Sequence, residues 1–497
     1  MKLEQQSIGT LCQLIQDGDL TALELCQFYL ERIENYDFHG PQLNSVIELN
    51  PDVLNLAEIL DIERSKKISR GPLHGIPILL KDNIDTGDRM VTSAGSLALE
   101  KSYAKRDAFL VQKLRNAGAI FLGKTNLSEW ANFRSSESVS GWSSRGGQTR
   151  NPFDILRNPS GSSSGSAVAV AAGFCAAAIG TETDGSILSP SSMNGVVGLK
   201  PNVGRISRRG LIPISYSQDT PGPITRNVAD ADLLLKVMSG EDIEDPVTLN
   251  SSKMPIKDDN FNKMGHLKDW TIGVVRNLNC SQSKVEILLE DAIQILKDLG
   301  AIVKDPIYPE NIINLKKPEF EVLLHEFKHG INHYLSELEG NSEWHPPDSL
   351  ENLIAFNETH KHKMMPYFGQ DLFERALKRR NLHSKLYQES LLECSRLSRL
   401  QGIDALLKEH ELDVFISLTT GPAWLTDYIL GDPISLTPSF KPSAVAGYPG
   451  ISVPLGLLSG LPIGISFFGG AWSENKLIRC AIEFENSIIP QKPPTLK

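Results

Sequence analysis

The sequence lacks the features that mark membrane proteins, secreted precursors and nucleic-acid-binding proteins. None of the apolar runs in its 497 residues is long enough to span a membrane. Its first residues, Met1 to Ser7, lack the apolar core of a signal peptide. The formal net charge is −10 and no basic run stands out, whereas phosphate binding needs clustered Lys and Arg. We therefore expect neither a membrane nor a nucleic acid as a partner.

Cysteine is scarce and scattered. The six cysteines form no CxxC pair, which in so long a chain is typical of reduced, mostly buried thiols. They are Cys12, Cys26, Cys175, Cys280, Cys394 and Cys480. We therefore expect a cytoplasmic protein, although a leader removed from a native precursor would leave no trace here, so secretion stays open. With 40% hydrophobic residues, the chain has ample material for a core.

Short apolar runs alternate with helical patterns along much of the chain. The run Ile76–Leu80 predicts a buried strand that ends at Lys81. Strand patterns at 271–275 and 301–303 flank a helical pattern at 285–299, which predicts a βαβ-like unit. This alternation indicates an α/β protein.

A long helical block interrupts the strand patterns in the second half of the sequence. Residues 316–410 are almost wholly helical in pattern, and strand patterns return at 414–418, 451–455 and 463–468. We interpret the block as an insertion between parts of one mixed sheet.

The most informative stretch runs from Pro159 to Pro201. It opens with a run of serines and glycines at 159–166, and the uncharged segment 167–178 follows. A helix that is apolar on all sides belongs in a core, so we predict a buried helix at Ala167–Ala178. A second Gly/Ser turn, 180–186, comes directly after it. Two serine turns joined by a buried helix indicate a catalytic constellation.

Three residues are candidates for the chemistry. Lys81 ends an apolar run, and a lysine in a dry site loses its charge and can act as a general base, although most lysines near strand ends are solvated. Ser186 follows Gly185 in a turn whose backbone N–H groups could hold an anion, although Asp-Gly turns are common. Ser162, taken alone, would be a solvated loop serine.

These segments together resemble one known family. The resemblance is carried in chain order by Gly75–Asp82, Pro159–Ala167, Gly180–Ile187, Gly195–Pro201, Asp219–Arg226 and Ala446–Leu455. They are similar to the motifs of the amidase signature family, and the match runs through nearly the whole chain.

The resemblance implies a fold and a reaction. It implies one domain over residues 1–497, in which a large, mixed, twisted sheet is covered by helices on both faces and the insertion at about 316–410 caps the acyl side of the cleft. The reaction is hydrolysis of a primary carboxamide to an acid and ammonia through an acyl-enzyme. No cofactor, metal or obligatory protein partner is expected, and the substrate is a small-molecule or peptide amide.

The resemblance also assigns roles. Ser186 is the nucleophile, Ser162 is a bridging serine after a cis Gly161–Ser162 bond, and Lys81 is the base. The backbone N–H groups of Thr183, Asp184, Gly185 and Ser186 form the oxyanion hole.

The sequence departs from the family's pattern near the nucleophile. Many members have Asp-x-Gly-Gly-Ser where this chain has Glu182 to Ser186, and many have an arginine just after the nucleophile, where residues 187–190 offer none. The missing cation argues against substrates that carry a carboxylate and against the glutaminase subunit of a tRNA-dependent amidotransferase.

Within the family, the peptide amidases, which remove ammonia from C-terminal peptide amides, are most similar. The segments around Trp424 and Trp472 carry this similarity, and Trp424, Tyr428 and Trp472 are candidates for an acyl-side pocket, although such aromatics are more often core. A broad aliphatic or aryl acylamidase and the amidotransferase subunit stay as alternatives.

Two other motifs match by pattern alone. His325 to His329 fits HExxH, a zinc-protease motif, on a segment, Phe320–Leu335, that we expect to be mostly solvated. Gly161 to Gly165 fits GxSxG, but no strand precedes it, as that motif requires. We therefore expect neither to mark the site.

Overall fold

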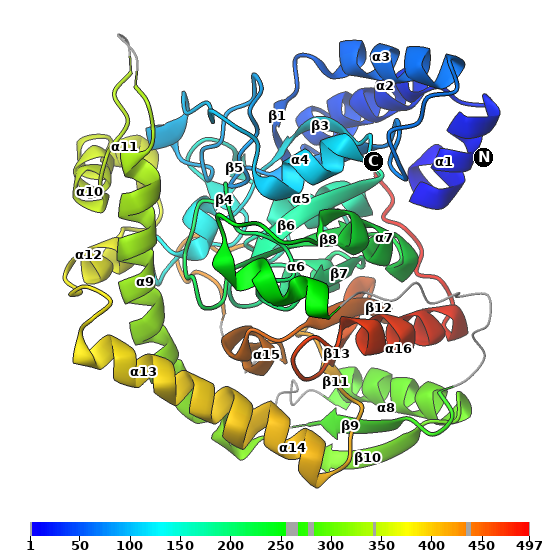
Figure 1. Cartoon of the computed structure of the whole chain (residues 1–497), viewed down its shortest axis with the longest axis vertical. Helices are drawn as coiled ribbons and strands as arrows, with labels where there is room; N and C mark the ends of the chain where they lie inside the picture. Colours follow the sequence, from blue (N-terminus) through cyan, green and yellow to red (C-terminus); the bar gives the residue numbers. More distant parts are fainter. Residues whose placement is uncertain (1, 255–266, 277–282, 341–343, 434–438, 497) are drawn as a thin grey trace.

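The chain is built on a large mixed sheet. The computed structural model describes residues 2–254, 267–276, 283–340, 344–433 and 439–496 (Figure 1). Eleven strands form the sheet. They are β1 (Val46–Leu49), β2 (Pro77–Lys81), β3 (Ile120–Thr125), β6 (Ala177–Glu182), β7 (Val197–Lys200), β8 (Thr220–Thr225), β9 (Thr271–Val275), β10 (Ile302–Ile307), β11 (Val414–Leu418), β12 (Gly450–Leu458) and β13 (Leu461–Phe468). The two short strands β4 (Trp142–Ser143) and β5 (Gly147–Gln148) pair separately.

The sheet combines parallel and antiparallel pairs, as predicted. Its order is β1-β3-β2-β6-β8-β7-β12-β13-β11-β9-β10. Strand β2 runs parallel to both β3 and β6, and β9 runs parallel to both β10 and β11. The pairs in between, from β6 to β11, are antiparallel. The predicted βαβ unit is therefore present, with α8 between β9 and β10.

Helices cover both faces of this sheet. They are α1 (Ile8–Asp17), α2 (Ala22–Arg32), α3 (Val53–Ser65), α4 (Phe109–Asn116), α5 (Ser164–Ala171), α6 (Leu188–Met193), α7 (Val228–Met238), α8 (Ser283–Asp298), α9 (Lys316–Ser336), α10 (Leu350–Thr359), α11 (Lys361–Met364), α12 (Asp371–Leu377), α13 (Lys385–Ser395), α14 (Asp404–Glu409), α15 (Lys441–Ala446) and α16 (Glu474–Ser487). Figure 1 shows the predicted insertion, α9 to α14, along one side and the lower edge of the molecule. The single-domain assignment of residues 1–497 stays a prediction.

The three strands that pair in parallel near one edge of the sheet are buried at every position. Strands β2, β3 and β6 expose none of their residues. Parallel strands with helices on both faces need apolar side chains on both faces, which explains their short unbroken apolar runs. Of the five described cysteines, all are free thiols and four are buried, whereas Cys280 lies outside the described residues.

The predicted helix at Ala167–Ala178 is wrong in its second half. Helix α5 ends at Ala171, the chain turns through Gly173 at φ +69°, and β6 begins at Ala177. An uninterrupted apolar run does not distinguish a buried helix from a buried strand, because neither has a polar face. The short connection lets a buried helix be followed at once by a buried strand.

Another local prediction is confirmed. The predicted strand β2 ends at Lys81. Within the described residues, every helix is too short or too polar to cross a bilayer.

Candidate active site

Two neighbouring parallel strands place the candidate residues at one edge of the sheet. Leu80 of β2 pairs with Ile179 of β6, so the carboxyl ends of these strands lie together. Lys81 is the last residue of β2, and the turn that carries Ser186 follows β6 directly. The topology therefore brings together residues that lie about a hundred positions apart.

The Lys81 side chain is fully buried among hydroxyl groups. Its Nζ lies 2.8 Å from Ser162 Oγ, 3.0 Å from Ser163 Oγ and 2.9 Å from Thr181 Oγ1. Burial lowers the pKa of Lys81 to about 7, because the charged form loses its hydration. The nearby carboxylates of Asp219 and Glu182 oppose this shift.

The hydrogen bonds around Lys81 limit which hydroxyls can donate to its amine. The Ser163 hydroxyl donates to the Thr181 carbonyl at 3.0 Å, so Ser163 Oγ can only accept from the amine. The Thr181 carbonyl, 3.2 Å from Nζ, can also only accept. A neutral amine has two N–H donors and one lone pair, and the hydroxyls of Ser162 at 2.8 Å and Thr181 at 2.9 Å are the two groups that can donate to that lone pair.

Ser186 lies in the turn between β6 and α6. It is 8% exposed, and its carbonyl accepts a hydrogen bond from the Ser163 amide at 3.1 Å, which ties the two serine turns together. Among the described residues, no hydrogen bond joins the Ser186 and Ser162 hydroxyls. The Gly161–Ser162 peptide bond is cis, as the resemblance implies.

Gly185 shapes the turn before Ser186. Its φ is +83°, in the left-handed region, and a Cβ there would lie 2.1 Å from the Phe440 ring. The Glu182 carboxylate holds the far side of the turn by accepting from the amides of Ile187 at 2.7 Å and Leu188 at 2.9 Å. Glycine is therefore required both for its conformation and for this close approach.

The amides of the turn are not equivalent. Within the described part of the chain, those of Thr183, Asp184 and Ser186 donate to no protein acceptor. The Gly185 amide instead interacts with the Glu182 carboxylate, where it helps to lower a pKa that burial raises. The amides of Thr183, Asp184, Gly185 and Ser186 all stay predicted oxyanion donors, and that of Gly185 is the one also attracted by a carboxylate.

Sequence reasoning assigned no role to three buried residues around the site. Ser163 and Thr181 contact the Lys81 amine, and Asp219 accepts a 2.6 Å hydrogen bond from the Thr183 hydroxyl. Burial raises the pKa of Asp219 to about 6. All three lie inside the segments that carry the family resemblance. The sequence motifs therefore included these residues but did not indicate what they do.

Residues 187–190 offer no cation after Ser186, as expected, but a distant segment brings one to the preceding turn. Lys441, at the start of α15, forms ion pairs with Asp184 of the turn and with Glu319 of α9. Its charge is therefore offset by two carboxylates. No motif marks it, because its partners lie more than a hundred residues away in the sequence.

Of the predicted pocket aromatics, Trp424 lies beside the segment that leads to Ser162, and Tyr428 packs against other aromatic residues. The Trp424 carbonyl accepts a 2.7 Å hydrogen bond from the Asn158 amide, four residues before Ser162. Tyr428 stacks on Tyr367 with ring centroids 4.0 Å apart. Both aromatic side chains are half-buried.

Trp472 has different contacts. The Arg205 guanidinium lies 4.7 Å from its ring centroid, and its amide donates to Asn202 at 3.1 Å. The structure therefore does not group Trp472 with Trp424 and Tyr428.

The HExxH motif has structural contacts. His325 Nδ1 lies 2.7 Å from the Glu321 carbonyl, and the Glu326 carboxylate accepts from three hydroxyls, those of Ser215, Ser217 and Tyr387. Both His325 and Glu326 are buried, so the prediction that this segment is mostly solvated is wrong. Among the described residues, no three His, Cys, Asp or Glu side chains are grouped to hold a metal.

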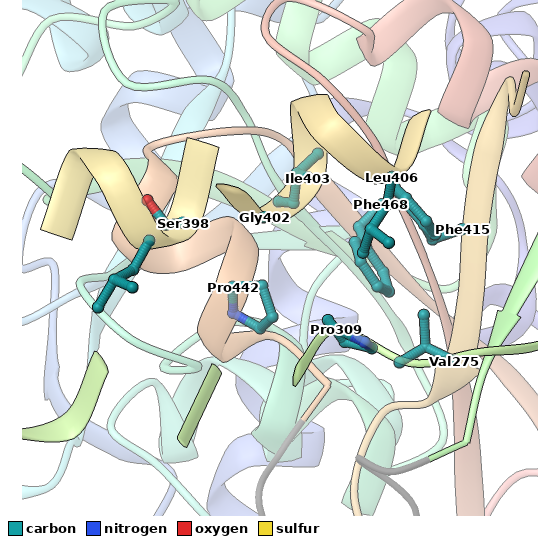
Figure 2. Close-up of a pocket in the computed structure, with 10 residues that line it drawn as sticks. Val275, Pro309, Ser398, Gly402, Ile403, Leu406, Phe415, Pro442 and Phe468 are labelled. Carbon is teal, nitrogen blue, oxygen red and sulfur yellow. The ribbon is translucent and has the colours of Figure 1, made fainter. Parts of the chain in front are cut away.

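A small apolar cavity lies below α15 (Figure 2). Its volume is about 10 Å³, which is no more than the room for one water molecule. Its walls include Pro442, Phe415 and Phe468, and none of the predicted site residues lines it. It is a packing defect rather than a substrate pocket.

Comparisons with known proteins show what this chain is similar to. The family model described as Amidase matches residues 24–478. The X-ray structure of native peptide amidase from Stenotrophomonas maltophilia is 45% identical, covers 99% of each chain and superposes with a TM-score of 0.92. An amidase family protein from Bacillus anthracis is 35% identical over 100% of this chain and 93% of its own, with a TM-score of 0.87. A probable amidase of Arabidopsis thaliana is 41% identical over 99% of this chain and 92% of its own.

The burial of Lys81 predicts an unusual titration. In protein labelled with ¹³C-lysine, the Lys81 Cε resonance should titrate near pH 7 and that of buried Lys200 near pH 8, whereas exposed lysines titrate above 10. The Lys81→Met variant should lose the lowest of these transitions and keep the one near pH 8. If Lys81→Met removed a resonance that titrates above pH 9, the account of a neutral lysine would fail.

Proposed function

Because this chain belongs to the amidase family and hydrolyses amide bonds, we propose that it releases ammonia from primary carboxamides through Lys81, Ser162 and Ser186. One observation carries the proposal, namely the 2.8 Å contact between the fully buried Lys81 amine and Ser162 Oγ. An amine whose pKa is about 7 is mostly neutral in slightly basic solution and can accept a proton.

The first step is acylation of Ser186. Its side chain turns toward Ser162, and its Oγ attacks the substrate carbonyl carbon while its proton passes to Ser162 Oγ. The Ser162 proton passes at the same time to the Lys81 amine, which becomes an ammonium. Catalytic hydrogen bonds are often incomplete without substrate, so the missing Ser186–Ser162 bond is compatible with this step.

The backbone then stabilises the negative charge on the substrate oxygen. The backbone amides of the turn, from Thr183 to Ser186, are the donors in this proposal, and they cost no reorganisation because the turn already holds them. Collapse of the tetrahedral intermediate breaks the C–N bond, and the proton stored on Lys81 returns through Ser162 to the leaving ammonia.

Water completes the cycle. It attacks the acyl-Ser186 ester, the same relay removes its proton, and the acid leaves as Ser186 regains its hydrogen. Every proton in this scheme moves between side chains of this chain, the substrate and water.

We infer that the acyl group is a peptide or another apolar group rather than an acid. The 45% identity to a peptide amidase supports this choice. The turn also carries no unpaired cation for a carboxylate, since Lys441 already contacts Asp184 and Glu319. An acidic acyl group would lose hydration there and gain no partner.

The proposed nucleophile is tested by Ser186→Ala. Ammonia release should fall at least ~1,000-fold, because neither the relay nor the oxyanion hole can act without the attacking oxygen. The matched control is Ser191→Ala, five positions later in the chain. It removes a buried hydroxyl that has no hydrogen-bond partner among the described residues. Near-native turnover by a folded Ser186→Ala protein would remove Ser186 from the mechanism.

The proposed substrate class is tested by kcat/KM for three amides. A capped dipeptide amide should be best, since its apolar side chains gain ~25 cal/mol per Å² of buried area. A simple aryl amide should be intermediate and a small acidic amide worst. The aryl amide in first place would favour a broad acylamidase, and the acidic amide in first place would contradict the specificity argument.

A further inference from the structure

The side chain of Asp184 is held by charged groups from two distant segments. Lys441 Nζ donates to Asp184 Oδ2 and to Glu319 Oε2. Gln218 adds a second link, because its side-chain amide donates to Glu319 Oε1 and to the Thr183 carbonyl, both at 3.2 Å. We call Lys441, Glu319 and Gln218 the turn clamp. It contacts two successive residues of the turn that precedes Ser186.

The clamp rests on rigid elements. Glu319 lies in the first turn of α9, a helix of 21 residues, and is 3% exposed. Lys441 is the first residue of α15, and its neighbour Phe440 packs against Gly185. The next residue, Pro442, lines the small cavity of Figure 2. The position of the Lys441 amine is thus set from both sides.

The charges favour a persistent clamp. The two carboxylates hold the pKa of Lys441 well above its usual range, so this amine stays charged. Burial raises the pKa of Glu319 to about 7, opposed by Lys441. The Lys441 ammonium has donors for both carboxylates at once, and its positive charge offsets theirs, which an uncharged side chain could not do.

We propose that Lys441 and Glu319 are positioning residues that fix the oxyanion turn of this amidase. The inference rests on the proposed function, because it assumes that the free amides of Thr183 and Asp184 face the developing oxyanion. Without the clamp, Asp184 would be free to rotate, and its backbone N–H group would no longer point at the substrate oxygen. The helical insertion would then contribute to catalysis through Glu319 and not only cover the site.

The test compares two inhibitors with the same peptide. A peptide aldehyde forms a tetrahedral adduct with Ser186 and places an oxygen in the oxyanion hole, whereas the corresponding peptide alcohol does not. Lys441→Met should weaken the aldehyde ~10- to 100-fold and lower kcat by a similar factor, less than the ~100- to 1,000-fold loss typical of deleting a whole donor. The Ki of the alcohol should change less than about twofold, because ground-state binding is untouched.

Two further variants separate positioning from general structure. Glu319→Gln keeps an acceptor for Lys441 and should retain most of the aldehyde affinity, whereas Glu319→Ala should behave like Lys441→Met. Lys476→Met removes an exposed ion pair with Asp413 and should change neither Ki. Thermal unfolding of each variant shows whether it folds, and only folded variants are compared.

The outcomes are distinct. If Lys441→Met and Glu319→Ala fold and bind the aldehyde as tightly as the unmodified protein, the clamp has no positioning role. Equal losses for the aldehyde and the alcohol would also overturn it, because they would indicate a deformed pocket. If Ser186→Ala still forms the aldehyde adduct, the proposed function itself is wrong, whatever the clamp variants do.

Discussion

The burial of one amine is the constraint on which this structure depends. Lys81 is fully enclosed, so its ammonium form is destabilised, and its lone pair has a hydroxyl partner in Ser162. A charged lysine in the same place would need a carboxylate contact. Instead, its hydrogen-bonding neighbours are the neutral groups of Ser162, Ser163 and Thr181. The sheet supplies this environment, because β2 and β6 end side by side beneath the serine turn.

The helical insertion stabilises the surroundings of that amine at several points along one helix. Near its start, Glu319 of α9 contacts Lys441, which also pairs with Asp184 in the turn before Ser186. In its last turn, Tyr334 donates a 2.9 Å hydrogen bond to Asp85, four residues after Lys81. Between them, Glu326 accepts hydrogen bonds from Ser215 and Ser217. A single helix therefore contacts the segment that follows Lys81 directly and reaches the turn before Ser186 through Lys441.

Much of the fold and of the candidate site could be predicted from the sequence, since the relevant signals are local. The strand that ends at Lys81, the βαβ unit and the insertion follow from hydrophobic periodicity, and the order of the motifs indicated the family. The end of α5 at Ala171 could not be predicted, because its apolar run continues unchanged into β6. The contacts of Lys441 could not be predicted either, since they join residues that only the folded chain brings together. The HExxH segment was wrongly expected at the surface for the opposite reason. Its polar residues are buried and form hydrogen bonds inside the protein.

The pH dependence of kcat/KM tests the central claim most directly. Lys81 acts only as the neutral amine, so activity on an uncharged peptide amide should rise with pH through about 7 and fall tenfold per unit below it. Glu319 also has a pKa of about 7, and the Glu319→Gln variant separates the two because it should keep the rise if Lys81 causes it. A rise near pH 7 in both proteins is the predicted result. A profile that is flat or falls between pH 6 and pH 8 would contradict a neutral lysine as the base.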